Sequence, residues 1–317
     1  MSSQPLLETR QLKKYFTTPA GPLHAVDGIN LSIEKGQTLG VVGESGCGKS
    51  TLGRTVLRLL EPTSGQVLFH GQDIRTLSKA QMKALRIKMQ MIFQDPYASL
   101  NPRLSVSDII AEPLIVSRLY PSAQERRRRI LELMDTVGLA QRLVNTYPHE
   151  LDGGRRQRIG IARALATQPE FIVCDEPVSA LDVSIQAQII NLMMDLQAQQ
   201  GLSYMFITHD LGVVKHISDH ICVMYLGQCV EFGTTDDLFD NPLHPYTQEL
   251  LKAIPSIDIT LKEHPVDVIA GEVTSPVAPA PGCRFAARCK FATPACTATD
   301  IPLKPHMGTH AVACTRY

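Results

Sequence analysis

A glycine-rich segment near residue 43 constrains the fold more than any other part of the sequence. Residues 43–50 read GESGCGKS, after the apolar run TLGVVG (38–43) and before the helix-like TLGRTVLRLL (51–60). This G-x-x-x-x-G-K-S spacing between a strand and a helix is typical of a phosphate-binding loop. Short apolar runs then alternate with helical patterns through residues 30–250. We therefore expect an α/β fold with a mainly parallel sheet.

The loop has the residue types that phosphate binding requires. Glycines let backbone N–H groups curl around phosphate oxygens, and the following helix adds its positive N-terminus. The Lys49 ammonium group is expected to reach the β- and γ-phosphates and the Ser50 hydroxyl to ligate Mg²⁺. A fortuitous glycine-rich turn is the alternative, and the spacing and context argue against it. The predicted nucleotide contacts are Gly43, Glu44, Ser45, Gly46, Cys47, Gly48, Lys49, Ser50 and Thr51.

A second buried strand is predicted to supply acidic groups. In FIVCDEP (171–177) the apolar run ends in Asp175, which is directly followed by Glu176. Adjacent carboxylates repel unless a cation or a proton lies between them. Asp175 is expected to hold Mg²⁺ through water, and Glu176 to polarise a water for attack on the γ-phosphate. Surface acids that close a strand are the alternative. A magnesium-dependent nucleoside triphosphatase is favoured.

Other apolar runs and periodic segments fill in the organisation. Further buried strands are predicted at 87–93, 202–209 and 220–227, and two amphipathic helices at 105–119 and 123–139. The helical stretch 97–150 indicates a subdomain inserted into the α/β core. Residues 271–282, GEVTSPVAPAPG, read as an extended linker.

Composition excludes some classes of partner and location. Lys plus Arg and Asp plus Glu both number 31, so the zero net charge gives no support to a nucleic-acid partner. No apolar stretch reaches the ~18 residues of a membrane-spanning helix, and the N-terminus lacks the apolar core of a secretion signal. A soluble, cytoplasmic protein is expected. Cys174 and Cys222 lie in apolar runs and are expected to be buried free thiols.

Four further motifs follow the loop in order: FQDP (93–96), GGRRQRIGIARAL (153–165), CDEPVSALD (174–182) and ITHD (207–210). With them, residues 6–255 closely resemble the ATP-binding subunit of ABC transporters. The resemblance implies a P-loop NTPase (RecA-like) cassette over residues 1–255, with an inserted helical subdomain at about 97–158. Phe16, with Tyr15 as second candidate, would stack on adenine. Gln94 would touch Mg²⁺ and the attacking water.

The resemblance also implies a cassette dimer in which each signature segment faces the ATP bound by the other subunit. His209 would hydrogen-bond the γ-phosphate, and Asp182 would line the dimer interface. The signature here is Asp152, Gly153, Gly154 and Arg155, where the family has serine at the first position and glutamine at the last.

The aspartate in the signature changes the electrostatics of that segment. A carboxylate ~4 Å from a phosphate oxygen costs about 1 kcal/mol in water and about 4 kcal/mol at an effective dielectric of about 20. The positive N-terminus of the helix stabilises a nearby negative charge by only ~0.3–1 kcal/mol. Arg155 is expected either to pair with Asp152 or to contact phosphate itself, and either contact would reduce the penalty. The alternative is that Asp152 has no effect or points away from the phosphate. A weakened site favours a heterodimer with a second, non-identical ATPase.

The C-terminal segment NPLHPYTQELLKAIP (241–255) and the residues after it resemble the extension of oligopeptide/dipeptide importer ATPases. The extension would cover residues 256–317. The resemblance implies two transmembrane permease subunits, an extracytoplasmic substrate-binding protein and a peripheral location on the cytoplasmic side of the inner membrane. Importers of nickel or glutathione are the nearest alternatives. A soluble ABC ATPase acting on ribosomes or DNA, or a regulator that does not hydrolyse, are more distant ones.

Four cysteines lie close together near the end of the chain. Cys283, Cys289, Cys296 and Cys314 are separated by 5, 6 and 17 residues. Disulfides are not expected in the cytosol, and the C-x₂-C knuckles usual for zinc are missing. The resemblance implies a candidate [4Fe–4S] cluster, since importers of this subfamily can carry one at this place, and irregular spacing suits one. Zinc and free thiols stay open. Because the linker separates these cysteines from the nucleotide loop in sequence, a structural or regulatory role is expected.

Overall fold

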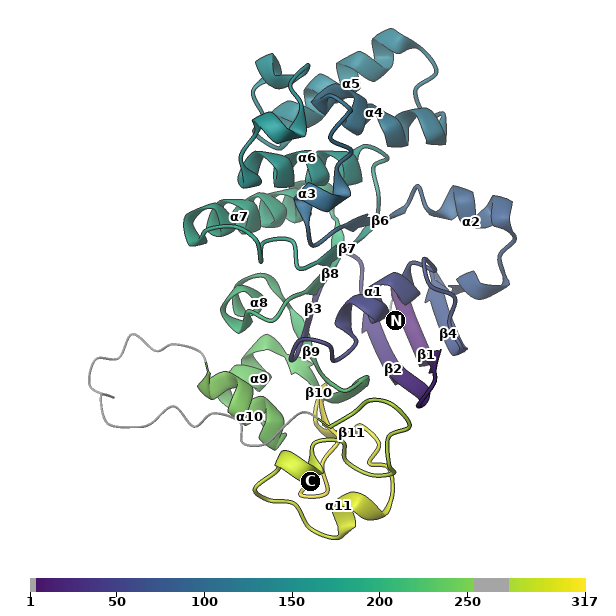
Figure 1. The fold of residues 1–317 in the computed structure, drawn as a ribbon, viewed down its shortest axis with the longest axis vertical. Coiled ribbons are helices and arrows are strands. Elements are labelled where there is room, and N and C mark those ends of the chain that lie inside the picture. Colours follow the sequence, from purple (N-terminus) through teal and green to yellow (C-terminus); the bar gives the residue numbers. More distant parts are fainter. Residues whose placement is uncertain (1–3, 254–273) are drawn as a thin grey trace, which may run out of the picture. The chain divides into compact units, whose positions relative to one another are not determined.

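The computed structural model describes residues 4–253 and 274–317, and these fall into two compact units (Figure 1). The first unit comprises the described residues of Met1–Ile33, Thr38–Arg75 and Thr208–Tyr317. The second comprises Glu34–Gln37 and Thr76–Ile207. The expected boundary between cassette and extension at 255/256 and the first residues of the expected linker, 271–273, lie outside the described residues.

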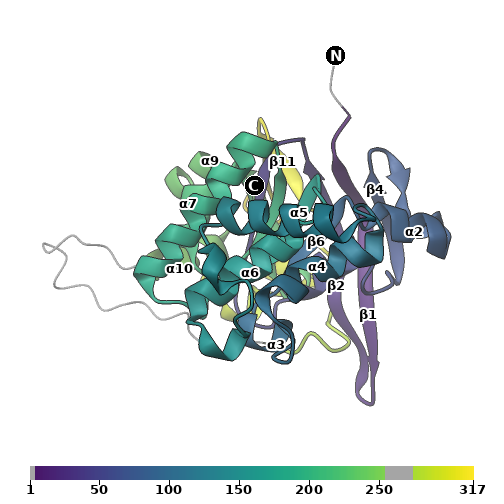
Figure 2. The same cartoon turned by 90° about the horizontal axis from the view of Figure 1, so that it is seen from above.

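An antiparallel sheet opens the first unit. Its strands lie in the order β2 (Gly21–Ile33), β1 (Leu7–Thr18), β4 (Ser64–Phe69) and β5 (Gln72–Asp73). Strands β1 and β2 pair along almost their whole length as a long hairpin, which Figure 2 shows side by side. Apolar side chains on one face of this hairpin, among them Leu7, Leu12 and Ile29, are buried. Burial of that face sets the register of the sheet.

The strand that leads into the glycine loop lies in another sheet of the first unit. Here β3 (Thr38–Val42) runs parallel to β9 (His220–Tyr225), and β9 pairs antiparallel with β10 (Gln228–Thr234). Strands β12 (His310–Val312) and β11 (Lys304–Met307) continue the sheet beyond β10. Every residue of β3 is buried, as expected of a parallel strand. The helices of this unit are α1 (Lys49–Val56), α8 (Leu211–Ile217), α9 (Thr235–Asp240), α10 (Pro245–Lys252), α11 (Ala295–Ala298) and the 3-10 turn η5 (Ala286–Arg288); a further 3-10 turn, η1 (Ile74–Thr76), follows β5.

The second unit combines a parallel sheet with most of the helices. Strands β8 (Ser203–Ile207), β7 (Phe171–Asp175) and β6 (Met89–Ile92) lie side by side in that order. Serine caps begin α4 and α5, and their apolar faces are buried. Figure 1 shows α4, α5 and α6 packed together at the end of this unit. The helical elements are α2 (Lys79–Leu85), α3 (Pro96–Ser99), α4 (Val106–Ser117), α5 (Ala123–Thr136), η2 (Gln141–Leu143), η3 (Pro148–Glu150), α6 (Gly153–Leu165) and α7 (Val183–Gln200).

These elements confirm the predicted strands and helices to within three residues at their ends. The strands predicted at 87–93, 202–209 and 220–227 are β6, β8 and β9, and the helices predicted at 105–119 and 123–139 are α4 and α5. Cys174 and Cys222 are fully buried free thiols, as expected. Among the helices of the described residues, none combines the length and the apolar character needed to cross a membrane.

The described part of the C-terminal extension is built into the first unit. Strand β12 pairs with β10 through Glu231↔Val312 and Phe232↔Ala311. The buried Glu231 carboxylate lies 2.8 Å from His310 Nε2 and also accepts N–H groups from the start of α10. The described residues of the extension therefore belong to the same compact unit as the glycine loop.

Phe285 anchors the extension in an aromatic cluster. Its ring is 1% exposed, and its centroid lies 5.3 Å from those of Tyr225 in β9 and Tyr246 in α10. Such clusters add about 0.5–1.5 kcal/mol per ring pair to the stabilisation from burial. The extension thus shares an apolar core with the sheet that carries the glycine loop.

We expect Phe285→Ala to lower the free energy of unfolding of the full chain by about 3–5 kcal/mol, because it leaves a cavity in this cluster. Phe291 is a matched control in the same extension, since its side chain is 41% exposed. Phe291→Ala should cost about 1 kcal/mol or less. Urea unfolding of both variants measures the difference, and equal losses would contradict the anchoring role of Phe285.

Candidate functional site

The glycine loop between β3 and α1 has a shape that only glycine permits at two positions. Gly43 has φ 147° and Gly48 has φ 105°. A Cβ atom at Gly43 would lie 2.1 Å from the Met224 carbonyl oxygen, and one at Gly48 would lie 1.9 Å from that of Ala25. The backbones of β2 and β9 therefore press directly against the loop. This close approach fixes the curl of the backbone at the start of α1.

Lys49 lies at the centre of this curl. Its ammonium group is buried and donates hydrogen bonds to the carbonyl oxygens of Gly43 at 2.7 Å and Glu44 at 2.9 Å. Cys47 beside it is also buried, and burial raises the pKa of its thiol, with the Lys49 charge opposing the shift. The loop thus concentrates one fixed positive charge at a helix N-terminus, where anions bind.

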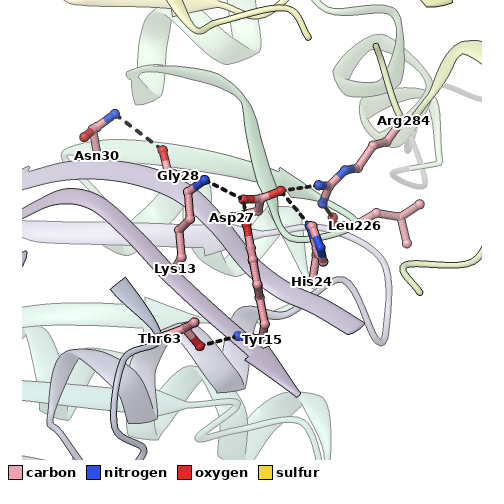
Figure 3. A network of polar contacts seen from close by, with 9 residues as sticks. All are labelled: Lys13, Tyr15, His24, Asp27, Gly28, Asn30, Thr63, Leu226 and Arg284. Carbon is pink, nitrogen blue, oxygen red and sulfur yellow. Dashed lines mark hydrogen bonds and ion pairs between the residues drawn. The ribbon is translucent and has the colours of Figure 1, made fainter. Parts of the chain in front are cut away.

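Asp27 in β2 is the centre of a polar network next to the loop (Figure 3). Its carboxylate accepts a hydrogen bond from the Tyr15 hydroxyl, lies 3.1 Å from His24 Nδ1 and pairs with Arg284. Burial by itself would raise the pKa of Asp27, but the bonds from Tyr15 and His24 and the Arg284 charge lower it to about 2. The carboxylate is therefore ionised at neutral pH.

Backbone bonds tie Asp27 to the loop. The Asp27 N–H donates to the Gly227 carbonyl at 2.8 Å, and the Gly227 N–H donates to the Cys47 carbonyl at 2.8 Å. Sequence reasoning missed Asp27, Arg284 and the Glu44 contacts made by Arg288 and Tyr246. Tyr246 lies in HPYT (244–247), and Arg284 and Arg288 lie in CRFAARC (283–289), but neither segment has a local pattern that points to the loop, and nor do the residues around Asp27.

The two candidates for adenine stacking have different surroundings. Tyr15 stacks on His24 with ring centroids 3.9 Å apart and bonds Asp27, which connects it to the loop. Phe16 is the next residue of β1, and its ring lies 4.9 Å from Lys14 Nζ. Successive strand residues point to opposite faces, so Tyr15 and Phe16 differ in the face they present. Adenine stacking by Phe16 or Tyr15 stays a prediction.

The acidic segment lies in the second unit, at the end of β7. Asp175 is fully buried, and Glu176 follows it with φ 46°, a conformation that is costly for a residue with a side chain. Its N–H donates to the Ile207 carbonyl at 2.8 Å. Gln94, which follows β6, donates from Nε2 to Glu176 Oε2 at 2.9 Å. The structure therefore brings together Gln94 and Glu176, which sequence reasoning assigned to one reaction.

Asp152 caps α6, as its position predicts. Its Oδ1 accepts the Arg155 N–H at 2.8 Å, and its Oδ2 lies 3.4 Å from Arg155 Nη1. Of the two roles expected for Arg155, the pairing with Asp152 is therefore present, with both side chains exposed; contact of Arg155 with phosphate stays a prediction. The glycines also have a role inside the chain, because a Cβ at Gly154 would lie 2.7 Å from Ile185 Cγ2 of α7.

The other two predicted positions lie at helix starts. Asp182 caps α7 by accepting the Ile185 N–H at 3.0 Å, and this bond and that from Ser184 lower the pKa of its exposed carboxyl. His209 is exposed in the first unit, two residues before α8. The preceding Thr208 N–H donates to the Val41 carbonyl of β3 at 3.2 Å.

The four C-terminal cysteines converge. Cys283, Cys289, Cys296 and Cys314 all line one small, mostly apolar cavity together with Phe285 and Ile301. Burial raises the pKa of Cys283 to about 11, and the neighbouring cysteines add to the shift. Hydrogen bonds with Thr315 and Thr293 lower the pKa of Cys296. Within the described ranges, no three His, Cys, Asp or Glu side chains already stand at metal-ligand spacing, so the cysteines share a cavity without preformed coordination.

A glycine loop closed around a buried lysine, an acid pair at a strand end and a capped signature helix define an ATP-binding cassette. The family model described as "ABC transporter" matches residues 26–179. A second, "Oligopeptide/dipeptide transporter, C-terminal region", matches residues 230–296. The chain belongs to the ABC transporter ATP-binding proteins, whose members are ATPases that use ATP with Mg²⁺.

Individual relatives are similar to this chain over nearly its whole length. The chain is 50% identical to the oligopeptide transport ATP-binding protein AppF of Bacillus subtilis, covering 100% of this chain and 98% of the relative. It is also 50% identical to the oligopeptide transport ATP-binding protein OppF of Escherichia coli, and the matched region covers 98% of this chain and 92% of that relative. Among solved structures, a post-hydrolysis dimer of the ATP-binding cassette MJ0796 with ADP and Pi is 30% identical. The matched region covers 72% of this chain and 98% of the MJ0796 chain, with a TM-score of 0.67. The expected α/β cassette fold is confirmed.

Proposed function

We propose that this chain is the ATP-hydrolysing subunit of an importer of di- and oligopeptides. The observation that carries this proposal is the match of residues 230–296 to the oligopeptide/dipeptide transporter C-terminal region. ABC ATPases of many kinds share the cassette motifs, whereas this C-terminal region indicates a class of substrate, namely oligopeptides and dipeptides. Relatives named for oligopeptide and dipeptide transport, which match the chain along its whole length, support the same substrate class.

Within this function the residues of the loop bind ATP and those at β7 act on water. The amides of residues 43–51 and the Lys49 ammonium group hold the phosphates, and Ser50, Gln94 and Asp175 are the proposed Mg²⁺ positions. Glu176 takes the proton of the attacking water while Gln94 orients it. His209 donates a hydrogen bond to the γ-phosphate. The Gln94–Glu176 hydrogen bond of 2.9 Å supports the pairing of these two roles.

The proposed assembly follows from the signature. The cassette (1–255, with the helical insertion at about 97–158) would dimerise through Asp182 and its signature, and the extension would cover 256–317. A carboxylate at residue 152 in both copies would weaken both ATP sites, so we infer a second, non-identical ATPase with an ordinary signature. Two permease subunits, an extracytoplasmic binding protein and a peripheral position on the cytoplasmic side of the inner membrane complete the proposal.

We also propose a [4Fe–4S] cluster held by the four C-terminal cysteines, with zinc or free thiols as alternatives. The convergence of all four side chains on one mostly apolar cavity supports a shared ligand. Burial raises the pKa of Cys283 and of Cys314, and the neighbouring cysteines add to both shifts. A cation bound between the thiolates would offset this cost. When bound, such a cluster supplies a covalent staple for a segment with a small core of its own. Cys283, Cys289, Cys296 and Cys314 would be its ligands.

The transport function predicts how the purified complex of this chain with its partners responds to substrate. Peptide-loaded binding protein should stimulate its ATPase, whereas nickel or glutathione should not. Glu176→Gln should lower hydrolysis by at least about 100-fold, because the general base is lost, and MgATP binding should stay unchanged. Lys49→Ala should abolish MgATP binding itself. Stimulation by nickel or glutathione alone would contradict the peptide assignment, and a fully active Glu176→Gln variant would contradict the catalytic one.

The charge of the signature predicts that Asp152→Asn and Asp152→Ser both raise the ATPase rate of the complex about two- to tenfold, since about 1 kcal/mol of repulsion disappears. Both replacements retain an N-cap acceptor, so α6 should stay intact. Steady-state phosphate release measures the effect. An unchanged or lower rate in both variants would reject the repulsion.

The cluster proposal predicts absorbance at about 400 nm and about four iron atoms per chain after anaerobic purification. Cys296→Ser should lose both signals, whereas Cys229→Ala, a buried cysteine of β10 that does not line the cavity, should retain them. Stoichiometric zinc without iron would replace the cluster by a zinc site. The absence of any bound metal would leave four free thiols and overturn the proposal.

A further inference from the structure

Glu44, the second residue of the nucleotide loop, is held by two side chains from far along the sequence. Its backbone N–H donates to the Tyr246 hydroxyl of α10 at 2.8 Å. Its carboxylate accepts two hydrogen bonds from Arg288, from Nη1 to Oε2 at 2.8 Å and from Nη2 to Oε1 at 2.9 Å. The Lys49 ammonium group binds its carbonyl oxygen. Every polar group of Glu44 therefore has a defined partner.

The Arg288–Glu44 pair is shielded from water. The Arg288 side chain is 5% exposed and that of Glu44 is 24% exposed. Arg288 Nη1 also lies 3.2 Å from the Tyr225 hydroxyl, and the guanidinium carbon lies 5.8 Å from the ring centroids of Tyr225 and Phe285. The bonds to Glu44 raise the pKa of Arg288, although burial opposes the shift. Bidentate, partly buried pairs of this kind are much stronger than exposed ones.

The local charges show why such a pair matters for a nucleotide. In residues 43–50 the charged side chains are those of Glu44 and Lys49, so the loop by itself is electrically neutral. In such a loop only the backbone N–H groups and the helix N-terminus give a net attraction for phosphate, and a bare carboxylate within the loop repels phosphate oxygens. Arg288 cancels that carboxylate and leaves the Lys49 charge uncompensated. The group that makes the loop cationic thus comes from the C-terminal extension.

The extension is built to hold Arg288 in place. Arg288 ends the 3-10 turn η5, and its N–H donates to the Phe285 carbonyl at 2.9 Å. Phe285 is buried against Tyr246, the same residue whose hydroxyl accepts the Glu44 N–H. One aromatic cluster therefore positions both contacts to Glu44.

We propose that Arg288 is a positioning residue of the ATP site, which neutralises Glu44 and fixes the first peptide of the loop for phosphate binding. The C-terminal extension is then a working part of nucleotide recognition, besides any role of its cysteines. This inference rests on ATP binding by the cassette and is independent of the transported substrate.

Equilibrium binding of MgATP to the purified full chain tests the proposal. Arg288→Ala should weaken the affinity about tenfold, equal to about 1.4 kcal/mol, because it leaves an unpaired carboxylate in the loop. The double variant Arg288→Ala/Glu44→Gln should regain affinity to within about threefold of the original, since the repelling charge is gone. Arg288→Lys, which keeps the charge without the bidentate geometry, should fall between the two.

Lys290→Ala is the matched control. Lys290 joins the extension to α10 through Glu249 at 3.0 Å and does not belong to the contacts of the loop. Its loss should leave MgATP affinity unchanged, and thermal unfolding should show all variants folded. In the assembled ATPase, Arg288→Ala should raise KM for ATP and leave kcat nearly unchanged. Unchanged MgATP affinity in Arg288→Ala, or a double variant as weak as Arg288→Ala, would overturn the proposal.

Discussion

The first unit depends on one constraint, the closure of the glycine loop around the Lys49 ammonium group. The loop must curl tightly enough for its own carbonyl oxygens to bind that group. The Met224 carbonyl group occupies the space where a Cβ atom of Gly43 would lie, and the Ala25 carbonyl group occupies that of Gly48. Strands β2 and β9 therefore have to approach the loop at a fixed distance. The long β1–β2 hairpin and the parallel pairing of β3 with β9 are the elements that hold them there.

The C-terminal extension takes part in this arrangement. Strand β12 lengthens the sheet, and Phe285 enters its core. Arg284 pairs with Asp27 next to the loop, and Arg288 pairs with Glu44 within it. Both arginines lie beside cysteines, Arg284 after Cys283 and Arg288 before Cys289. The segment that converges on the cysteine cavity is therefore the segment that reaches the loop. Cys289 is thus one peptide bond away from the arginine that pairs with Glu44.

The second unit contains the proposed general base and the signature, and local contacts position both. Glu176 adopts a left-handed backbone conformation directly after β7, which turns the chain sharply away from the strand and leaves its carboxylate bonded to Gln94. Asp152 caps α6 and pairs with Arg155, so its charge is already partly compensated within the chain. The packing of Gly154 on Ile185 shows that this glycine also serves the fold of a single chain.

The sequence by itself determined the features that depend on neighbouring residues. Strand and helix periodicity, the glycine loop, the acids at the end of β7 and the cap at Asp152 involve groups a few positions apart, so their pattern is visible in the chain. The family followed from the order of these motifs. Only the tertiary structure decided which distant groups complete the loop, since Arg288 lies 244 positions from Glu44 and Arg284 lies 257 from Asp27. The convergence of four irregularly spaced cysteines was equally invisible. Such pairings arise when buried apolar anchors such as Phe285 bring remote segments together, and no local pattern of residues encodes which charges then meet.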